Sequence, residues 1–277
     1  MYQDYYPDAN LSDLVDLFFS IRRTGTKQSE SAVDLIVPDG TLGLLFVHRG
    51  NLRRSSLQGN TQLLEDSYFF GQKTKSVYYE FNPLQLDIFG LKLKAGALMK
   101  LFGVSPEEIT DTLVPAHAVL GQKFGDLQAR LATTSDTLGR KRVLETFLLH
   151  TQQERNDKDR LLDAILKHIK QVRGNTSVSE LTSHFQVGYK RLERLFKTYT
   201  GLTPKQFCRI IRFNATLYYQ RRVETLTDLA YSAGYFDQMH FIKEVKNITD
   251  LSPSQFYKDI GQGIAPQHRR HIASKYA

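Results

Sequence analysis

Two stretches near the carboxyl end of this 277-residue chain repeat almost the same twelve letters. FKTYTGLTPKQF occupies residues 196–207 and VKNITDLSPSQF occupies residues 245–256, with six of the twelve positions identical. Chance rarely produces such agreement, so the repeat predicts two copies of one supersecondary unit. The two copies are offset by 49 residues at this phrase, but the first helix of each copy aligns at an offset of 48 residues. The second copy is therefore expected to contain a turn that is one residue longer.

The first copy has the pattern of a short helix, a tight turn and a second helix. Ser177 is expected to cap a helix that runs through His184. The letters QVG then indicate a turn in which Gly188 tolerates a sharp path. A second helix is expected over about 189–199. This layout is typical of the helix-turn-helix motif, whose second helix enters the major groove of DNA.

The second copy repeats this layout and is joined to the first by a longer helix. Gly234 and Tyr235 mark its turn, and Asp237 is expected to cap a second helix over about 237–247. The joining helix is expected to be capped by Thr203, with Pro204 at its first position. About 17 residues of helix span roughly 25 Å. Such a rod can hold two reading helices about one DNA turn apart.

The net charge of +8 is unevenly distributed. Residues 1–156 contain 17 Lys and Arg against 18 Asp and Glu, a balance of −1, whereas residues 157–277 contain 20 against 11, a balance of +9. All of the positive excess therefore lies in the part that contains the repeat. This distribution indicates a polyanionic partner for that part. Charge alone does not separate DNA from RNA, an acidic protein or a membrane surface.

Residues of about 159–260 resemble the DNA-binding domain of the AraC family of bacterial transcription regulators. The resemblance rests on the two helix-turn-helix units with their joining helix, on GYFDQMHF at 234–241 and on SPSQF at 252–256. Glu244 and Val245 depart from the aromatic and apolar pair usual in the family. The resemblance implies a protein that binds double-stranded DNA sequence-specifically, with RNA polymerase as a candidate partner. The single cysteine, which can form no internal disulfide, separately favours the reducing cytoplasm as its location. The target site and the choice between activation and repression stay open.

By this resemblance, the outward side chains of the two second helices are expected to contact DNA. Arg194 suits guanine, Gln238 suits adenine and Glu193 can accept a hydrogen bond from cytosine. The base-contact candidates are Lys190, Glu193, Arg194, Gln238, Met239, His240 and Lys243. The phosphate-contact candidates are Tyr189, Arg191, Lys197 and Lys246.

Several of these candidates have a purely structural alternative. Lys197 and Lys246 lie near helix C-termini, where the helix dipole favours a cation in any case. Glu193 can pair with a neighbouring arginine, and His240 can be a structural histidine. Asp237 is expected to be a cap rather than a base reader.

The N-terminal part reads as a β-rich unit followed by helices. Short strand patterns separated by Gly, Asn and Pro between about 32 and 95 predict a barrel-like or sandwich arrangement. Helices are expected over about 96–155, including one at SPEEITD that is capped by Ser105 and in which Glu108 completes a capping box. In a later helix, over about 139–155, one apolar stripe either packs on the barrel or forms a dimer seam. The stripe consists of Val143, Leu144, Phe147 and Leu148.

Two N-terminal stretches resemble a cupin-like domain that is often fused to such regulators. They are VPDGTLGLLFVHRG at 37–50 and the segment at 90–121. The resemblance implies a regulatory domain with an unidentified small-molecule effector, in a protein that forms a homodimer. We therefore expect a multidomain α+β chain: a regulatory and dimerisation domain at 1–156, an all-α double helix-turn-helix domain at 157–262 and a basic tail at 263–277.

No pattern of catalytic, metal-binding or cofactor-binding residues stands out. The eight histidines lack metal-ligand spacing, and there is no nucleophile elbow, phosphate-binding glycine loop or dinucleotide fingerprint. His48 is expected to be structural. Cys208 is the single cysteine, and its place beside the apolar face of the joining helix favours packing over alkyl transfer. We expect no enzymatic activity, no cofactor, no metal and no membrane association. A small-molecule enzyme and a ligand-independent architectural DNA binder remain the alternative classes.

Overall fold

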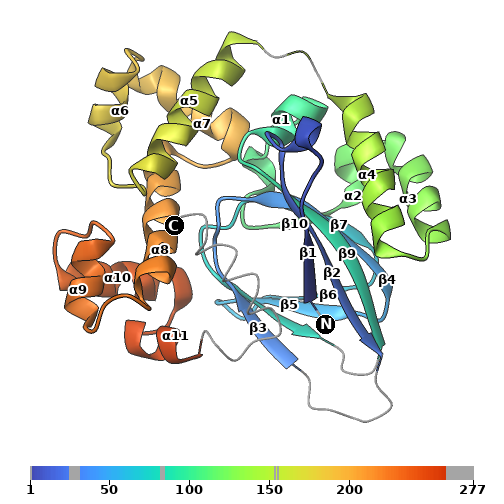
Figure 1. Ribbon diagram of the computed structural model, residues 1–277, viewed down its shortest axis with the longest axis horizontal. Helices are drawn as coiled ribbons and strands as arrows, with labels where there is room; N and C mark the ends of the chain where they lie inside the picture. Colours follow the sequence, from blue (N-terminus) through green and yellow to red (C-terminus); the bar gives the residue numbers. More distant parts are fainter. Residues whose placement is uncertain (1, 25–31, 82–84, 153, 155, 260–277) are drawn as a thin grey trace.

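The computed structural model describes residues 2–24, 32–81, 85–152, 154 and 156–259. It has a β-rich N-terminal part built on two sheets and a helical C-terminal part, which confirms the expected fold class. Figure 1 shows helices α5 to α11 grouped on one side of the sheets. The basic tail at 263–277 lies outside the described residues.

The N-terminal part contains two antiparallel sheets. The six-stranded sheet has the order β1-β2-β9-β4-β7-β10, and the four-stranded sheet has the order β3-β8-β5-β6. The strands are β1 (Tyr2–Tyr5), β2 (Val15–Thr24), β3 (Ala32–Ile36), β4 (Leu42–Arg49), β5 (Leu52–Ser56), β6 (Thr61–Leu64), β7 (Ser67–Phe70), β8 (Val77–Phe81), β9 (Gln85–Leu93) and β10 (Leu113–Pro115).

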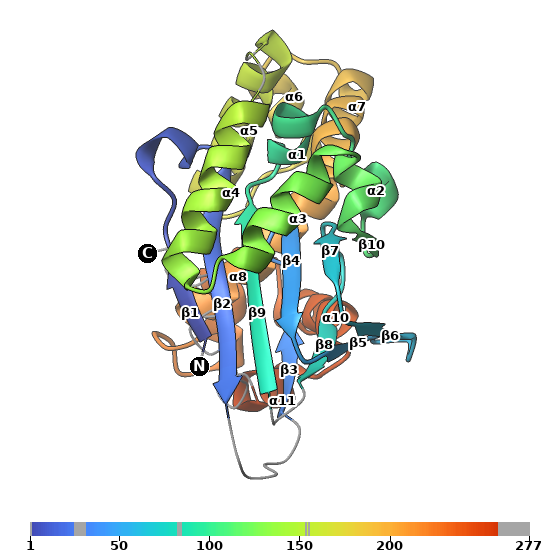
Figure 2. The ribbon, with the colours of Figure 1, turned by 90° about the vertical axis from the view of Figure 1, so that its right-hand side faces the viewer.

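Four helices cover the outer face of the six-stranded sheet, as Figure 2 shows for α3 and α4. The helices are α1 (Ala97–Phe102), α2 (Ala116–Leu120), α3 (Lys123–Thr133) and α4 (Thr137–Thr151), with short 3₁₀ turns η1 (Ala9–Leu11) and η2 (Glu107–Ile109). Leu144 and Leu148 of α4 are fully buried against this face. Val143 and Phe147 pack half-buried on the same cluster. The apolar stripe of α4 therefore packs on the sheet, which decides one alternative left open by the sequence.

The strands begin earlier than the expected range of about 32–95, because β1 and β2 precede it. β2 escapes a search for alternating residues because both of its faces are covered. Phe18 packs in the cluster beneath the helices, whereas Leu17 and Phe19 pack between the two sheets. A strand buried on both sides reads as one continuous apolar run.

Two expectations for residues 96–121 are wrong. The SPEEITD segment forms only the single turn η2, and Glu108 closes no capping box. Ser105 Oγ accepts a hydrogen bond from the Glu107 N–H at 3.4 Å, a long distance for this type of bond. The chain then turns at Asp111, whose φ is 61°, and continues as β10, which pairs with β7. Strand pairing thus ends the helical turn before it can grow.

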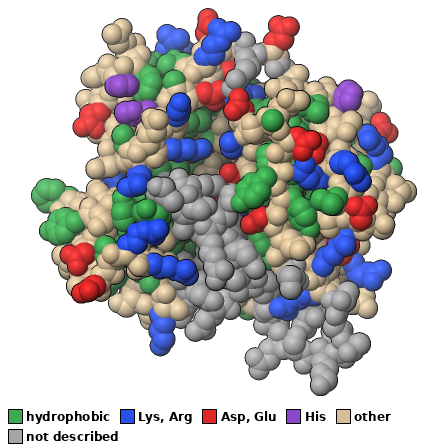
Figure 3. All heavy atoms as spheres, viewed as in Figure 1, with side chains coloured by type: hydrophobic (Ala, Val, Ile, Leu, Met, Phe, Trp, Pro, Cys, Tyr) green, Lys and Arg blue, Asp and Glu red, His purple; other side chains and the backbone are tan. Residues whose placement is uncertain are grey.

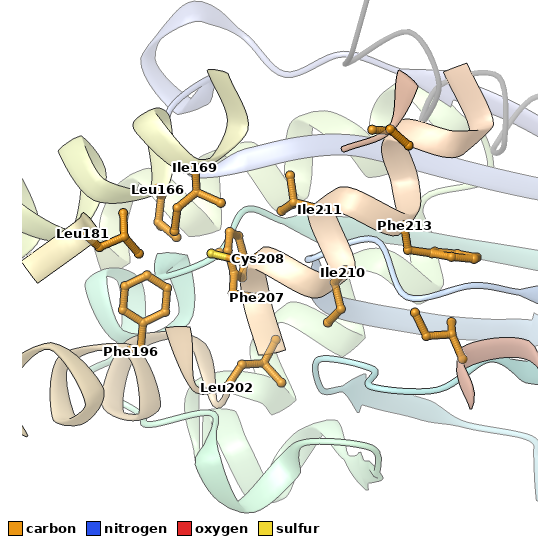
Figure 4. Close-up of a cluster of buried hydrophobic side chains, with 14 of the residues drawn as sticks. Leu166, Ile169, Leu181, Phe196, Leu202, Phe207, Cys208, Ile210, Ile211 and Phe213 are labelled. Atoms are coloured by element: carbon orange, nitrogen blue, oxygen red, sulfur yellow. The ribbon is translucent and has the colours of Figure 1, made fainter. Parts of the chain in front are cut away.

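The C-terminal part packs α5 (Asp157–Gln171), α6 (Val178–His184), α7 (Tyr189–Thr200), α8 (Pro204–Tyr219), α9 (Leu226–Ser232), α10 (Gln238–Thr249) and α11 (Pro253–Asp259) around one core. Figure 4 shows the centre of this core, where Phe207 of α8 lies near Leu166 and Phe196, and Ile210 and Ile211 lie further along the same helix. Val37 and Ala95 of the N-terminal part belong to the same cluster. The two parts of the chain therefore share buried apolar contacts.

Cys208 lies in this core, 3% exposed, as its expected packing role requires. Burial raises the pKa of its thiol to about 11. Since the thiolate is the reactive form, we expect the native protein to react with a disulfide reagent at pH 8 at least tenfold more slowly than the urea-unfolded chain. The reaction is followed by absorbance. Equal rates in the two states would show that the thiol is accessible.

Candidate nucleic-acid interface

The structure contains both helix-turn-helix units. In the first unit, residues 185–188 join α6 to α7, and in the second, residues 233–237 join α9 to α10. The second turn is one residue longer, which confirms the expectation from the two offsets. The observed helices also lie close to the predicted ranges of 189–199 and 237–247.

Side-chain caps fix where these helices begin. Ser177 accepts a hydrogen bond from the Glu180 N–H and forms a capping box, as does Thr203 with Gln206. Asp237 accepts from the His240 N–H at 2.6 Å, so its expected capping role is confirmed. At α5 the cap is Asn156, and Asp159 is its capping-box partner.

The two turns use different residues for their left-handed backbone. Gly234 has a φ of 83° in the second unit, as its turn signal indicates. In the first unit the positive φ belongs to Gln186, at 50°, whereas Gly188 has an extended conformation with a φ of −64°. The sharp path expected at Gly188 is therefore made two residues earlier. Gly188 instead occupies the N-cap position of α7, where glycine is acceptable.

Helix α8 connects the two units and sets their separation. Figure 1 shows α6 and α7 at one end of α8, and α9 and α10 at the other. Its sixteen residues span roughly 24 Å at 1.5 Å per residue. This length is compatible with two reading helices about one DNA turn apart.

Most of the sequence-predicted contact residues lie on the exposed surface of α7 and α10. The exposed candidates are Tyr189, Lys190, Arg191, Arg194, Lys197, Met239, His240, Lys243 and Lys246. Glu193 and Gln238 are half-buried. The Glu193 carboxylate accepts from the Tyr189 hydroxyl at 2.9 Å, and the Gln238 side-chain oxygen accepts from the Thr227 hydroxyl at 3.0 Å.

The contacts of Glu193, Gln238 and His240 show which structural roles these candidates have in addition to any contact with DNA. Among the described residues, Glu193 is held by the tyrosine rather than by an arginine. The bond to Thr227 leaves the amide nitrogen of Gln238 available as a donor. The ring of His240 lies edge-on to that of Tyr235, with centroids 5.4 Å apart, so this histidine has both an exposed surface and a packing role.

The N-terminal part holds the C-terminal ends of both reading helices. Thr110 Oγ1 donates to the carbonyl of Gly201, the C-cap of α7, at 3.0 Å, and Lys197 lies 3.7 Å from Glu107. In the second unit, the Ser76 N–H donates to the carbonyl of Ile248, in the last turn of α10, at 2.7 Å. These contacts use carbonyls that a helix leaves unpaired at its C-terminus. Sequence reasoning missed them, because nothing in the repeat indicates which loops cover it.

Glu244 has a role that sequence reasoning also missed. It lies on the buried face of α10, 9% exposed, accepts a hydrogen bond from the Tyr235 hydroxyl at 2.9 Å and forms an ion pair with Arg209 of α8 at 3.1 Å. Burial and this carboxylate raise the pKa of Tyr235. The residue that departs from the family pattern thus ties the second reading helix to the joining helix.

The second unit also exposes apolar side chains. Phe236, immediately before the cap of α10, is 86% exposed, and Tyr231 and Met239 are largely exposed as well. Figure 3 shows hydrophobic side chains projecting at the edge where α9 and α10 lie, with Lys and Arg side chains nearby. This combination of cations and apolar groups is suited to contacts with phosphates, base edges and thymine methyl groups.

The rest of the described structure shows few features of other classes of site. Its residues contain no group of three His, Cys, Asp or Glu side chains placed to hold a metal. His48 is half-buried, and burial, with Arg140 nearby, lowers its pKa to about 4. None of the helices described is both long and apolar enough to cross a bilayer.

Comparisons with known proteins give a separate family match in each part of the chain. Residues 181–259 match a family described as a helix-turn-helix domain, and residues 3–115 match a domain of unknown function. An HTH-type transcriptional regulator of Haemophilus influenzae is 24% identical over 43% of this chain and 39% of its own length. The transcriptional activator RhaS of Klebsiella pneumoniae is 32% identical over 30% of this chain and 29% of its own length, and the regulator MtrA of Neisseria gonorrhoeae is 28% identical over 37% and 35%.

This chain therefore matches only about a third of the length of each of these relatives. Among solved structures, ToxT from Vibrio cholerae aligns over 92% of this chain and 97% of its own, with 8% identity and a TM-score of 0.47.

The environment of Glu244 predicts a large effect on stability. Glu244→Ala would leave both the Tyr235 hydroxyl and Arg209 without their acceptor, so we expect the free energy of unfolding to fall by about 1–3 kcal/mol. Urea denaturation followed by circular dichroism measures this change.

Glu193→Ala is the matched control, because Glu193 also accepts from a tyrosine at 2.9 Å but on a far more exposed surface. Its effect is expected to stay within about 0.5 kcal/mol. Similar losses for the two variants would contradict the structural role assigned to Glu244.

Proposed function

Because residues 181–259 are a helix-turn-helix domain of the AraC type, we propose that this protein is a sequence-specific DNA-binding transcription regulator. The observation that carries the proposal is the pair of exposed reading helices, α7 and α10, at the two ends of α8. Both present cationic and polar side chains. Two such helices about a DNA turn apart read adjacent stretches of major groove.

The roles of the exposed side chains follow from their chemistry. Arg194 donates to guanine O6 and N7, and the amide of Gln238 pairs with adenine. Lys190, Met239, His240 and Lys243 complete the base-reading surface, with Glu193 as an acceptor for cytosine. Tyr189, Arg191, Lys197 and Lys246 bind phosphates, which supplies affinity and register without sequence information.

The N-terminal part, residues 1–156, regulates the DNA-binding part, residues 157–262, in this proposal. Its contacts to the ends of α7 and α10 support this role, because a change in the sheets can reach both reading helices. A small-molecule effector, a homodimer and RNA polymerase are the partners that fit a cytoplasmic regulator of this kind. The protein acts by binding and has no enzymatic activity of its own.

Selection from a random duplex library tests the proposal directly. The full-length protein is expected to enrich a site with two conserved blocks about one helical turn apart. Affinity for that site should exceed affinity for a random duplex by about 10³ or more. The logarithm of the affinity should also fall linearly with the logarithm of the salt concentration. An equal affinity for all sequences would instead indicate an architectural binder.

Arg194→Ala is expected to cost about 1–3 kcal/mol of binding and to relax specificity at one base pair, since Arg194 is assigned to a base edge. Fluorescence anisotropy with single-base variants of the selected site measures both effects. Lys246→Ala is the matched comparison, because a phosphate contact should weaken binding to all sequences alike and reduce the salt slope by about 1. A uniform loss for Arg194→Ala would reassign it to a phosphate.

A further inference from the structure

A cavity of about 80 Å³ lies between the two sheets of the N-terminal part. Its wall is mostly apolar and comes from both sheets: Phe19, Ile21 and Ile88 from the six-stranded sheet, and Leu52, Tyr79 and Phe81 from the four-stranded sheet. The volume is well below the roughly 300–1,000 Å³ of sites for drug-sized molecules. The cavity therefore suits a ligand with few carbon atoms.

Lys73 brings a buried positive charge into this wall. Its side chain lines the cavity, and the residue is only 6% exposed. Its ammonium lies 4.9 Å from the centre of the Phe70 ring. Within the part of the chain that the structure describes, no carboxylate or other acceptor forms a hydrogen bond or ion pair with it. A buried cation without such a partner is costly, so the site is chemically incomplete.

The other charged groups around the cavity are already engaged. Lys92 also lines it but forms an ion pair with Asp39. Asp34 lines the cavity too, is buried, and has interactions of its own. Lys73 is thus the lining cation for which a ligand can supply the missing negative charge.

We propose that this cavity binds a small organic carboxylate, whose oxygens accept hydrogen bonds from the Lys73 ammonium while its apolar body packs among the side chains of both sheets. A carboxylate supplies the charge-assisted acceptor that the ammonium lacks. The aromatic and aliphatic wall favours a hydrocarbon body over a polar one, such as a sugar.

The segment that carries Lys73 contacts the reading helix α10 directly and is bonded to the loop that contacts α7. Residues 71–76 connect β7 to β8, and the Ser76 N–H donates to the carbonyl of Ile248 in α10. Thr74 donates from its backbone N–H and its hydroxyl to the two carboxylate oxygens of Asp111, at 2.7 and 2.6 Å. The neighbouring Thr110 donates to the carbonyl of Gly201 at the end of α7. A carboxylate that repositions Lys73 therefore alters the segment that holds α10 and, through Asp111, the loop that holds α7.

This coupling rests on the proposed function in DNA binding, whereas the ligand site does not. A ligand shifts the equilibrium between two states only when it binds them with different affinity. We expect carboxylate binding to change the affinity of the full-length protein for its selected duplex about fivefold or more, as is typical of coupled sites.

Titration calorimetry with the full-length protein tests the site without DNA. Benzoate, hexanoate and acetate are the probes at pH 7, and benzamide and benzylamine are the neutral and cationic comparisons. At least one carboxylate should bind saturably, and at least tenfold more tightly than the two comparisons. Lys73→Met and Lys73→Gln should each weaken that binding tenfold or more, whereas Lys75→Met, on the exposed side of the same segment, should leave it unchanged.

Absence of saturable binding by all three carboxylates would overturn the proposal. So would unchanged affinity in both Lys73 variants, or a preference for benzylamine. If carboxylates bind in a Lys73-dependent manner but leave the affinity for DNA unchanged, the coupling is wrong. If the protein selects no DNA site at all, the proposed function fails while the calorimetric result still decides the ligand site.

The pH dependence of stability provides a second measurement on the same residue. Burial lowers the pKa of Lys73 from 10.5 to about 8, with Lys92 and Arg54 lowering it further and Asp39 and Asp111 opposing them. Between about pH 8 and 10.5 the unfolded chain then binds a proton that the folded protein does not, so the free energy of unfolding contributed by this group rises with pH. Urea denaturation at pH 7.5 and 10 should show this rise in the wild type relative to Lys73→Met. An equal pH dependence would show that the ammonium is not desolvated.

Discussion

Burial of helix α8 on nearly all sides is the constraint on which the DNA-binding part depends. Phe207, Ile210 and Ile211 pack against the first unit and the N-terminal part, whereas the ring of Phe213 packs at a tilt against that of Phe256 of α11 at the other end. A close-packed core of this kind is not continuously deformable. The two reading helices are therefore held at one separation unless the core itself rearranges. The repeated phrase gives each reading helix the same turn and the same capped start of the helix that follows it, α8 in the first unit and α11 in the second.

The N-terminal part contacts this rigid unit at chemically equivalent places. Each reading helix ends with carbonyls that no helical N–H can reach, and loops of the N-terminal part donate to one of them in each unit, at Gly201 and at Ile248. At Gly201 a side chain would collide with Thr110 and Pro106, so the close approach also needs a glycine. These few hydrogen bonds can be broken and formed again at a much lower cost in free energy than the packing of the apolar core. They are suited to regulation, whereas the core is suited to fixed geometry.

Local rules predicted the helical part well and the β-rich part less well, for physical reasons. Capping residues such as Ser177, Thr203 and Asp237 bond a backbone N–H only three residues further along the chain. The local sequence is therefore enough to predict where these helices begin. β2 was missed because it is buried on both faces, and η2 was overestimated because pairing of β10 with β7 interrupts it. The outward positions of α7 and α10 followed from helical periodicity, whereas their assignment to DNA contacts comes from the family resemblance. Arg209, which pairs with Glu244, and the cavity wall around Lys73 come from segments far away in the sequence, which no local pattern reveals.

The buried lysines are of two kinds: those that are paired with a carboxylate of the protein and have a structural role, and Lys73, which is not paired in this way within the described part of the chain. Lys92 pairs with Asp39 inside the sheets, and Lys100 of α1 pairs with Asp163 of α5 across the two parts of the chain. In both cases a carboxylate within the protein balances the charge, so each lysine is explained by architecture alone. Lys73 lies beside an apolar cavity without a comparable partner among the described residues. Retaining an ammonium there opposes folding, because methionine would fill the same space without a charge. The physical argument for such a residue must therefore come from what enters the cavity.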